Sequence, residues 1–337
     1  MRVLRSFAIS IAVAAAIFAA FDPIFDAWLP HFARLRANFS ATYLQRELET
    51  ARGRDPVVVL GDSVLWGYGV ASADSAIGRI RRRRANWQNF AYPGGSPVNS
   101  LTMFRLLRAA RITPRLVVFN VNQKTFNPLD SAFGHLHPAV EDLVSADGID
   151  VSDERLLPSL PQTLDARLER AIGRFWHFYG MRADLRDALF DESDAATRVK
   201  RVIELWSRTA DTIARAHRPK TADFQDVYDL TPLDEDNSSF RALETLARSL
   251  ARAGVPALAV LTPTNHTLLH DYIDDPLYRS NLRATRTMLR RFGVDVVDLD
   301  AAFATGEFID NDHLTAAGNA RLAALLSAAV DGRRRRR

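Results

Sequence analysis

The sequence predicts an α/β protein built on a flavodoxin-like parallel sheet of about five strands, and three observations support this fold class. Short apolar runs are each followed by turn residues and then by a helical pattern, the alternation typical of parallel sheets. The runs are apolar throughout instead of alternating, as in strands buried on both faces. Hydrophobic residues make up 47% of the chain and charged residues 25%, which indicates a globular protein with a sizeable core.

The elements follow in order along the chain. The apolar runs predict strands over residues 57–60, 87–91, 116–121, 257–261 and 294–299. Apolar residues three and four positions apart predict helices over residues 98–111, 240–253, 277–292 and 315–330. These elements place the sheet domain in two parts of the chain, residues 55–127 and 238–331.

Residues 128–237 interrupt the predicted sheet. Their apolar pattern is wholly helical and is divided by prolines, so they predict a helical insertion. The insertion contains the aromatic run 175–179, which we expect to form a packing face; the alternative is a wall for a substrate or a membrane surface. After the last helix, residues 332–337 are basic and carry no apolar side chain, so we expect a disordered, solvated tail.

The amino terminus has the pattern of a signal or membrane anchor over residues 1–30. Arg2 and Arg5 precede an uncharged apolar run over residues 7–21. Apolar residues resume up to residue 29, which favours an uncleaved anchor through residues 7–29, followed by an amphipathic linker helix over 31–54. The positively charged end of an anchor stays on the cytoplasmic side, so we expect the rest of the chain to lie outside the cytoplasmic membrane, in the periplasm. A cleaved signal that releases a soluble exported form, and a buried amino-terminal core helix, are the alternatives.

Charge and cysteine content exclude several classes of function. The net charge is +4, but Arg81 to Arg84 and Arg333 to Arg337 supply nine positive charges, so the rest of the chain is net negative. No basic face with interleaved aromatic residues recurs, and we expect no nucleic-acid partner. The absence of cysteine excludes thiol nucleophiles, disulfides and cysteine-ligated metals. No pattern in the sequence indicates a cofactor or a metal site.

The first candidate for chemistry is Gly61-Asp62-Ser63, directly after the predicted strand 57–60. Gly61 permits a tight turn, and Ser63 falls at the carboxyl edge of the sheet where a helix would begin. Ligands bind at this edge in open α/β sheets, and the first amides of such a helix can receive an anion. The alternative is that Asp62 or Ser63 only caps the helix.

The second candidate is Asp310-Asn311-Asp312-His313, near the other end of the chain. A serine hydroxyl becomes a nucleophile when a base takes its proton, and that base needs a carboxylate to hold its tautomer. Asp310 and His313 are close enough in sequence for a direct hydrogen bond, so we predict a triad of Ser63, His313 and Asp310. The alternative is a surface histidine beside a helix cap at Asp312.

With these two motifs the sequence resembles the SGNH or GDSL hydrolase superfamily, over about residues 55–127 and 240–330. Gly61-Asp62-Ser63 matches its first block, and Asp310 to His313 matches its last block, Asp-x-x-His. The segment from Asn89 to Gly94 is similar to the second block, Asn-x-x-x-x-Gly. Asn120-Val121-Asn122-Gln123 stands where the family usually has Gly-x-Asn-Asp, so it departs from the third block at Asn120 and Gln123.

The resemblance implies the roles of several residues. An oxyanion hole would be formed by the backbone amides of Ser63 and Gly94 and the side-chain amide of Asn122. After the fourth strand, Asn265 and His266 are candidates to line the cleft; the alternative is that they only shape a loop.

The segment Pro263-Thr264-Asn265, together with the predicted anchor, also resembles membrane-tethered branches that modify cell-wall polymers or exopolysaccharides by acyl transfer. The expected function is therefore a membrane-tethered serine esterase or O-acyltransferase acting on an extracytoplasmic, acetyl-like ester of a glycan. A multi-span acyltransferase would be its partner. The alternatives are a catalytically silent SGNH-like module that binds a polymer or a membrane partner, and an exported lipid esterase.

Overall fold

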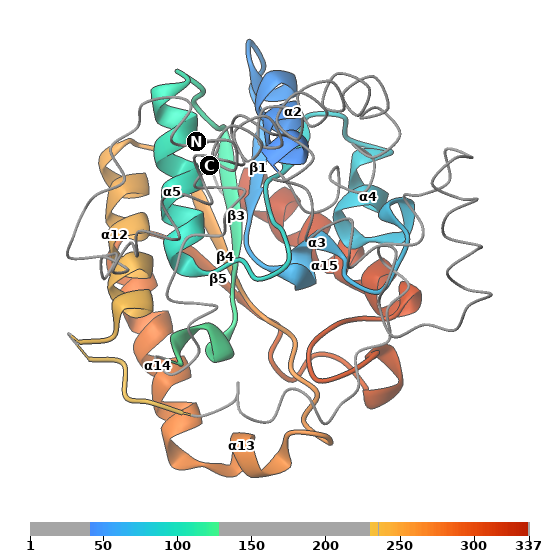
Figure 1. Cartoon of the computed structure of the whole chain (residues 1–337), viewed down its shortest axis with the longest axis vertical. Helices are drawn as coiled ribbons and strands as arrows, with labels where there is room; N and C mark the ends of the chain where they lie inside the picture. Colours follow the sequence, from blue (N-terminus) through green and yellow to red (C-terminus); the bar gives the residue numbers. More distant parts are fainter. Residues whose placement is uncertain (1–40, 128–229, 235, 336–337) are drawn as a thin grey trace, which may run out of the picture. The chain divides into compact units, whose positions relative to one another are not determined.

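A computed structural model describes residues 41–127, 230–234 and 236–335 (Figure 1). They form a five-stranded, wholly parallel sheet in the order β2-β1-β3-β4-β5. The strands are β1 (Val57–Leu60), β2 (Trp87–Asn89), β3 (Leu116–Val121), β4 (Ala257–Leu261) and β5 (Asp295–Asp298). The predicted α/β class and all five parallel strands are confirmed, with β2 and β5 shorter than expected, and the sheet is compatible with a flavodoxin-like fold.

Burial explains why the strand sequences are so uniformly apolar. Every residue of β1, β3 and β4 is buried, because these strands lie inside the sheet with helices on both faces. β5 is an edge strand, and its four residues are exposed or half-buried. Its sequence, Asp-Val-Val-Asp, accordingly has polar residues at both ends.

Helices cover both faces of the sheet: α5, α12 and α14 lie on one face, and α4 and α15 on the other (Figure 1). The α-helices are α2 (Ala41–Ala51), α3 (Ser63–Trp66), α4 (Ala76–Arg81), α5 (Pro97–Ala109), α12 (Ser238–Arg252), α13 (His270–Asp274), α14 (Pro276–Arg291) and α15 (Ala316–Arg335). Three short 3-10 helices are η1 (Ser72–Asp74), η2 (Gln123–Phe126) and η4 (Thr305–Glu307). The four predicted helices are confirmed within a few residues, whereas α3, α4 and α13 were not predicted.

The two described ends of the insertion meet beside η2. The Phe126 carbonyl accepts hydrogen bonds from Asn237 Nδ2 at 2.8 Å and from Thr231 Oγ1 at 3.3 Å. The chain therefore leaves and rejoins the sheet domain at one place, at the carboxyl ends of the strands. Residues 128–229, with the aromatic run 175–179, lie outside the described residues.

The basic tail is the one predicted segment that the structure contradicts. Helix α15 continues through Gly332 to Arg335, where we expected a disordered tail from residue 332. Arginine is a good helix former, so the run extends the helix instead of ending it. Arg333 is half-buried, donates to the Ala257 carbonyl at 2.6 Å and pairs with Asp295.

The predicted anchor over residues 7–29 lies outside the described residues. Of the predicted linker helix over residues 31–54, residues 41–51 are helical as α2, which ends three residues earlier than predicted. In the described ranges, no helix is long and apolar enough to cross a membrane.

Candidate active site

The turn after β1 presents Ser63 at the start of helix α3. Asp62 is the N-cap, and its carboxylate accepts a hydrogen bond from the Val64 amide at 2.8 Å. Gly61 has a φ of 142°, and a Cβ at this position would lie 1.8 Å from the Asn120 side-chain oxygen. Only glycine fits here, because the Asn120 side chain approaches the turn so closely.

The loop before α15 carries the other two members of the predicted triad. A bridge between Phe308 and Leu314 closes this loop. Inside it, Asp310 Oδ1 accepts hydrogen bonds from the backbone amides of Asp312 at 3.1 Å and His313 at 2.8 Å. Two backbone amides of the loop therefore hold the Asp310 carboxylate in position, in addition to its contact with the His313 ring.

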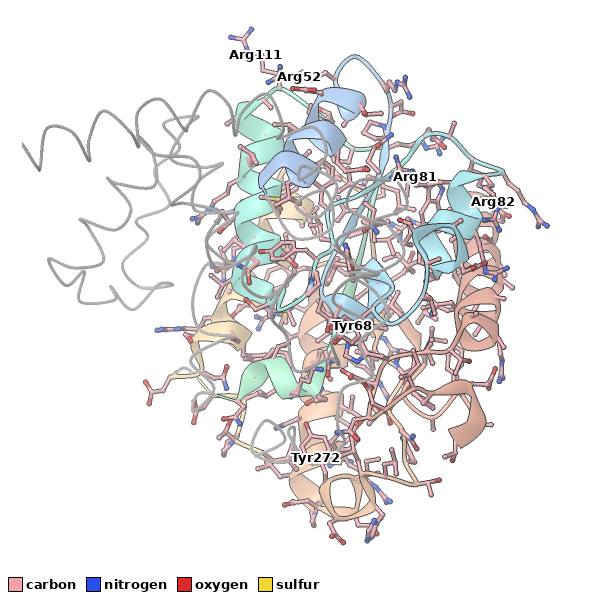
Figure 2. All side chains as sticks on the ribbon, turned by 45° about the vertical axis from the view of Figure 1, so that its right-hand side comes forward. Arg52, Tyr68, Arg81, Arg82, Arg111 and Tyr272 are labelled. Carbon is pink, nitrogen blue, oxygen red and sulfur yellow. The ribbon has the colours of Figure 1, made fainter. Side chains whose placement is uncertain are left out.

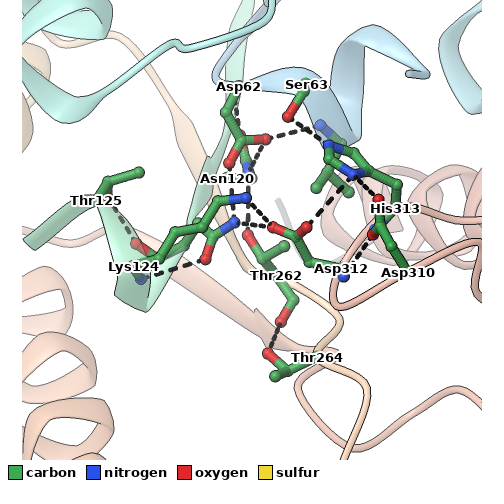
Figure 3. Close-up of polar contacts among 12 residues, drawn as sticks. Asp62, Ser63, Asn120, Lys124, Thr125, Thr262, Thr264, Asp310, Asp312 and His313 are labelled. Atoms are coloured by element: carbon green, nitrogen blue, oxygen red, sulfur yellow. Dashed lines mark hydrogen bonds and ion pairs between the residues drawn. The ribbon is translucent and has the colours of Figure 1, made fainter. Parts of the chain in front are cut away.

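Ser63, His313 and Asp310 form a continuous chain of hydrogen bonds (Figure 3). His313 Nδ1 lies 2.7 Å from Asp310 Oδ2, and His313 Nε2 lies 2.7 Å from Ser63 Oγ. Since a carboxylate only accepts, Nδ1 carries the proton and Nε2 accepts from the serine hydroxyl. The structure therefore brings together the three residues predicted as a triad, in the geometry of a nucleophile, its base and an orienting acid.

These side chains are more enclosed than a position at a solvent-facing edge would suggest. Ser63 is 8% exposed and His313 is 5% exposed. The ring of Tyr68 packs against the imidazole, with 4.6 Å between ring centres. Tyr68 thus covers His313 and restricts its rotation away from Ser63.

A second polar network lies beside the triad (Figure 3). Asn122 Nδ2 donates to Asp62 Oδ2 at 3.1 Å and to Asp312 Oδ2 at 2.6 Å. The ammonium of Lys124 pairs with the same Asp312 oxygen at 2.5 Å, and both of these side chains are nearly fully buried. Asn120 Nδ2 donates to Asp62 Oδ1 at 2.8 Å. The turn that carries Ser63 is therefore joined to the His313 loop through buried carboxylates, amides and one lysine.

Burial and charge set the protonation of this network. Burial raises the pKa of Asp62 above its ordinary value, and the Lys124 ammonium offsets only part of the rise. Burial also acts to raise the pKa of Asp312, but Lys124, His313 and Asn122 outweigh it, so the pKa of Asp312 is lowered. The pKa of Lys124 is raised, because the charges of Asp312 and Asp62 outweigh the effect of burial. Asp312 and Lys124 thus form an ion pair, and Asp62 is the carboxyl group that binds a proton more readily.

The predicted oxyanion-hole residues do not converge fully. Both hydrogens of Asn122 Nδ2 are engaged by Asp62 and Asp312, so in this arrangement its side chain has no free donor for an oxyanion. Gly94 lies on an exposed turn with a φ of 74°. The Ser63 amide lies in the first turn of α3, where helix amides point towards incoming negative charge. The roles of the Ser63 and Gly94 amides stay predictions.

The two candidates after β4 hold loops in place. Asn265 is 2% exposed; its backbone amide donates to the Asn311 carbonyl at 2.8 Å, and its Nδ2 donates to the Asp310 carbonyl at 3.1 Å. Asn265 therefore positions the loop that carries the triad acid and base. His266 Nε2 lies 3.1 Å from Asp300 Oδ2, and its side chain is 38% exposed.

The carboxylates of Asp310 and Asp312 and the ring of His313 lie within 4.8 Å of one another, a grouping that could hold a metal ion. Lys124 already places a positive charge on Asp312, and Asp310 is bonded to His313. A cation would have to displace both contacts, so we assign these residues no metal.

Sequence reasoning missed Lys124 and Tyr68, and Lys124 is the charged one of the two. It follows Asn122 in η2, where no periodic pattern marks a buried position. One signal was present: it is one of only three lysines among the 44 basic residues of the chain. Lysine is a compact charge that a small buried site can accommodate, whereas arginine carries a broad planar group.

Comparison of the chain with protein-family models and with curated proteins finds no match.

Proposed function

We propose that this protein is a serine esterase or O-acyltransferase that uses Ser63 as nucleophile, His313 as base and Asp310 as the acid that orients the base. The observation that carries the proposal is the pair of 2.7 Å contacts that joins the three side chains through His313. A buried serine bonded to the Nε2 atom of a carboxylate-held histidine is the arrangement that activates a hydroxyl group.

The reaction proceeds in two balanced steps. Ser63 Oγ attacks the ester carbonyl while His313 Nε2 takes its proton; the carbonyl then re-forms, and His313 returns the proton to the leaving alcohol. Water or a second hydroxyl attacks the acyl-serine in the same way and regenerates Ser63. We propose the Ser63 amide, at the start of α3, as a donor for the developing oxyanion.

The substrate and location are part of the same proposal. The motifs at both ends of the sheet domain resemble the SGNH superfamily, and the apolar run over residues 7–21 resembles an export anchor. We infer an acetyl-like ester of an extracytoplasmic glycan as substrate, with the domain tethered to the cell membrane on its periplasmic side.

Fluorophosphonate labelling of the full chain tests the nucleophile. We expect the wild type to be labelled at Ser63, and Ser63→Ala to lose the label. Ser100→Ala is the matched control, because Ser100 is a buried serine that lines a small cavity beside Asp62, and it should keep the label. A folded wild type that takes no label, or a label that persists in Ser63→Ala, would contradict the proposal.

One observation favours a second candidate, a catalytically silent module that binds a polymer. The side chain of Asn122, which the resemblance assigns to the oxyanion hole, is fully occupied by two carboxylates. In a serine hydrolase, removal of one oxyanion-hole donor lowers the stabilisation of the transition state by about 2.7–4 kcal/mol. Binding of an acetylated glycan without labelling or turnover would support this candidate.

A further inference from the structure

The connections that enter three neighbouring strands carry an unusual excess of arginine. Strands β2, β1 and β3 are adjacent in the sheet, and all three are parallel, so the connections before them lie at one edge. These connections span residues 52–56, 82–86 and 110–115. They contain seven arginines and one acidic residue, Asp55.

Most of these arginines have no ion-pair partner within the described ranges. Arg84 pairs with Asp331, and Arg115 lies 3.8 Å from Asp55. The five others are exposed and form no ion pair there, and we call them the arginine edge: Arg52, Arg54, Arg82, Arg83 and Arg111. Figure 2 shows Arg52 and Arg111 together at one end of the described chain, with Arg82 apart from them on the right-hand side.

The helix dipole does not account for the arginine edge. Cations are favoured in the last turn of a helix, and this explains Arg108 in α5 and Arg252 in α12. The effect falls off within that turn, whereas most of the arginine edge lies beyond the helix ends. These charges are therefore not needed by the helices that precede them.

Arg111 is kept at a position that its backbone disfavours. Its φ is 58°, and it is the one residue other than glycine with a positive φ in the described part of the chain. At the matching positions after α2, α12 and α14 the chain has Gly53, Gly254 and Gly293. An exposed arginine at such a site is best explained by what its side chain binds.

The opposite edge of the sheet is acidic, so the charge is separated along the strand direction. The segments at the carboxyl ends of the strands, including α13, carry five exposed aspartates: Asp234, Asp236, Asp271, Asp274 and Asp275. Figure 2 shows Tyr272, in the same helix as Asp271 and Asp274, at the end opposite Arg52 and Arg111. Tyr68, which covers His313, lies between these two ends.

We propose that the arginine edge docks on the surface of an anionic lipid bilayer and holds the Ser63 edge of the sheet away from it. Two observations favour a bilayer over a single polymer chain. The arginines are spread over three connections across neighbouring strands, as a surface would require, and are not arranged along one track. The apolar run over residues 7–21 also precedes α2, which leads directly into Arg52 and Arg54.

A hollow beside this edge supports contact with lipid head groups. It has a volume of about 330 Å³, and its wall includes Arg82, Arg83 and alanines of α15, with Arg84 there bonded to Asp331. Guanidinium groups bind phosphate oxygens in a planar, two-bond geometry. The hollow is large enough to receive the phosphate of a lipid head group.

The test is competition of the full-length protein between two vesicle populations. One is phosphatidylcholine alone, and the other, made dense with trapped sucrose, also contains phosphatidylglycerol. Residues 1–40 are the same in every variant, so their contribution to the ratio cancels. We expect the wild type to prefer the anionic vesicles, and the preference to fall as salt rises.

Two charge-matched variants separate the arginine edge from net charge. Arg54→Glu/Arg83→Glu should lower the preference for anionic vesicles by at least about fivefold for each arginine, so by at least about 25-fold, because each change also adds a negative charge. Arg279→Glu/Arg283→Glu makes the same change in net charge on exposed positions of α14 and should leave most of the preference. Equal losses in both variants, or no loss in the first, would overturn the proposal.

Arg111→Gly gives a readout that a structural role would not give. It should weaken the preference about fivefold and at the same time raise the melting temperature, because glycine adopts a φ of 58° without strain. A lower melting temperature, or unchanged binding, would contradict the argument. The proposal concerns a surface remote from Ser63, so esterase activity on a soluble ester should be unchanged in all three variants.

Discussion

The histidine–aspartate pairs His313–Asp310 and His266–Asp300 both lie at the carboxyl edge of the sheet, and they differ in the nitrogen that binds the carboxylate. His313 binds Asp310 through Nδ1, which leaves Nε2 for the hydroxyl of Ser63. His266 binds Asp300 through Nε2, and its side chain is 38% exposed. A histidine next to a carboxylate is therefore not a sufficient sign of an active site.

The surroundings of the second pair indicate a structural role. The Tyr278 hydroxyl donates to the Asp300 carboxylate, and the Asp300 carbonyl accepts from the Thr264 amide at 3.0 Å. Asp300 thus ties the loop after β4 to the loop after β5. In the first pair, backbone amides position Asp310 and the Tyr68 ring covers His313. In the second pair, Asp300 itself positions Tyr278 and the loop at Thr264.

Substitutions at Ser63 and His313 should have the largest effect, and they distinguish the His313–Asp310 pair most clearly from the His266–Asp300 pair. Ser63→Ala or His313→Ala should each lower kcat by about 10⁶-fold, because each removes part of one catalytic unit. Steady-state kinetics on an activated acetyl ester measures this loss. The double variant should be no worse than either single one, and a multiplied loss would show that the two residues act separately.

Replacing the aspartate of each pair should show the same difference between the two pairs. Asp310→Asn should lower kcat by about 10⁴-fold, because the histidine would lose the partner that sets its tautomer. Asp300→Asn is the matched control and should change kcat by less than about threefold. Asp312→Asn should impair turnover less than Asp310→Asn, since Asp312 Oδ1 lies 3.5 Å from His313 Nδ1. The reverse order would move the triad acid to Asp312.

The buried ion pair beside His313 should affect stability. Lys124→Met should lower the free energy of unfolding by about 3–5 kcal/mol, because it leaves Asp312 buried without its cation. Urea unfolding would measure the loss, and Lys124→Met/Asp312→Asn should recover most of it. No recovery in the double variant would mean that Lys124 acts through packing.

The same pair predicts a pH dependence of stability. The pKa of Asp312 is lowered in the folded state, so its contribution is present above the ordinary carboxyl pKa of 3.8. It is lost as the pH falls from that value through the folded-state pKa. Unfolding curves of the wild type should show this loss, and Lys124→Met/Asp312→Asn should lack it.

A smaller effect is expected from the residue that positions the loop of the first pair. Asn265→Ala should lower kcat by about 10²-fold with little change in KM, because the Asp310 loop loses the hydrogen bond from Asn265 Nδ2 to the Asp310 carbonyl. The pH at which kcat is half-maximal should shift as well. A change confined to the melting temperature would restrict Asn265 to a structural role.

The smallest effect should come from the histidine of the second pair. His266→Ala should change kcat by less than about threefold and the free energy of unfolding by less than about 1 kcal/mol, because the pair is partly exposed. A loss as large as that of Asn265→Ala would place His266 in contact with the substrate.

Local patterns predicted the sheet well, and they also selected three residues that the structure joins by hydrogen bonds. The strands are continuous apolar runs buried on both faces, and Ser63, Asp310 and His313 follow strands or precede a helix with little intervening chain. Contacts between distant segments could not be predicted in this way. Lys124 and Asp312 meet only after β3 and the final loop are brought to one edge, and no local rule marks either as a partner of the other.

Charge patterns were harder to interpret than apolar ones. The run from Arg333 was expected to be solvated because it contains no apolar residue, yet Arg333 finds Asp295 at the start of β5. Asn122 matched a family position, but the neighbouring Asp62 and Asp312 take up its donors. Both outcomes depend on which charges the fold brings close, and sequence spacing carries no record of that.

The separation of Ser63 and His313 by 250 positions has a consequence for the newly made chain. Strands β1, β2 and β3 all lie within the first 121 residues, so the serine and its turn are synthesised early. At about 5–20 residues per second, roughly ten seconds or more pass before the ribosome reaches His313. During that interval the hydroxyl of Ser63 has no base, and the growing chain cannot acylate itself. Under the proposed mechanism, Ser63 becomes reactive only when the loop before α15 docks, so folding of that loop would also activate the serine.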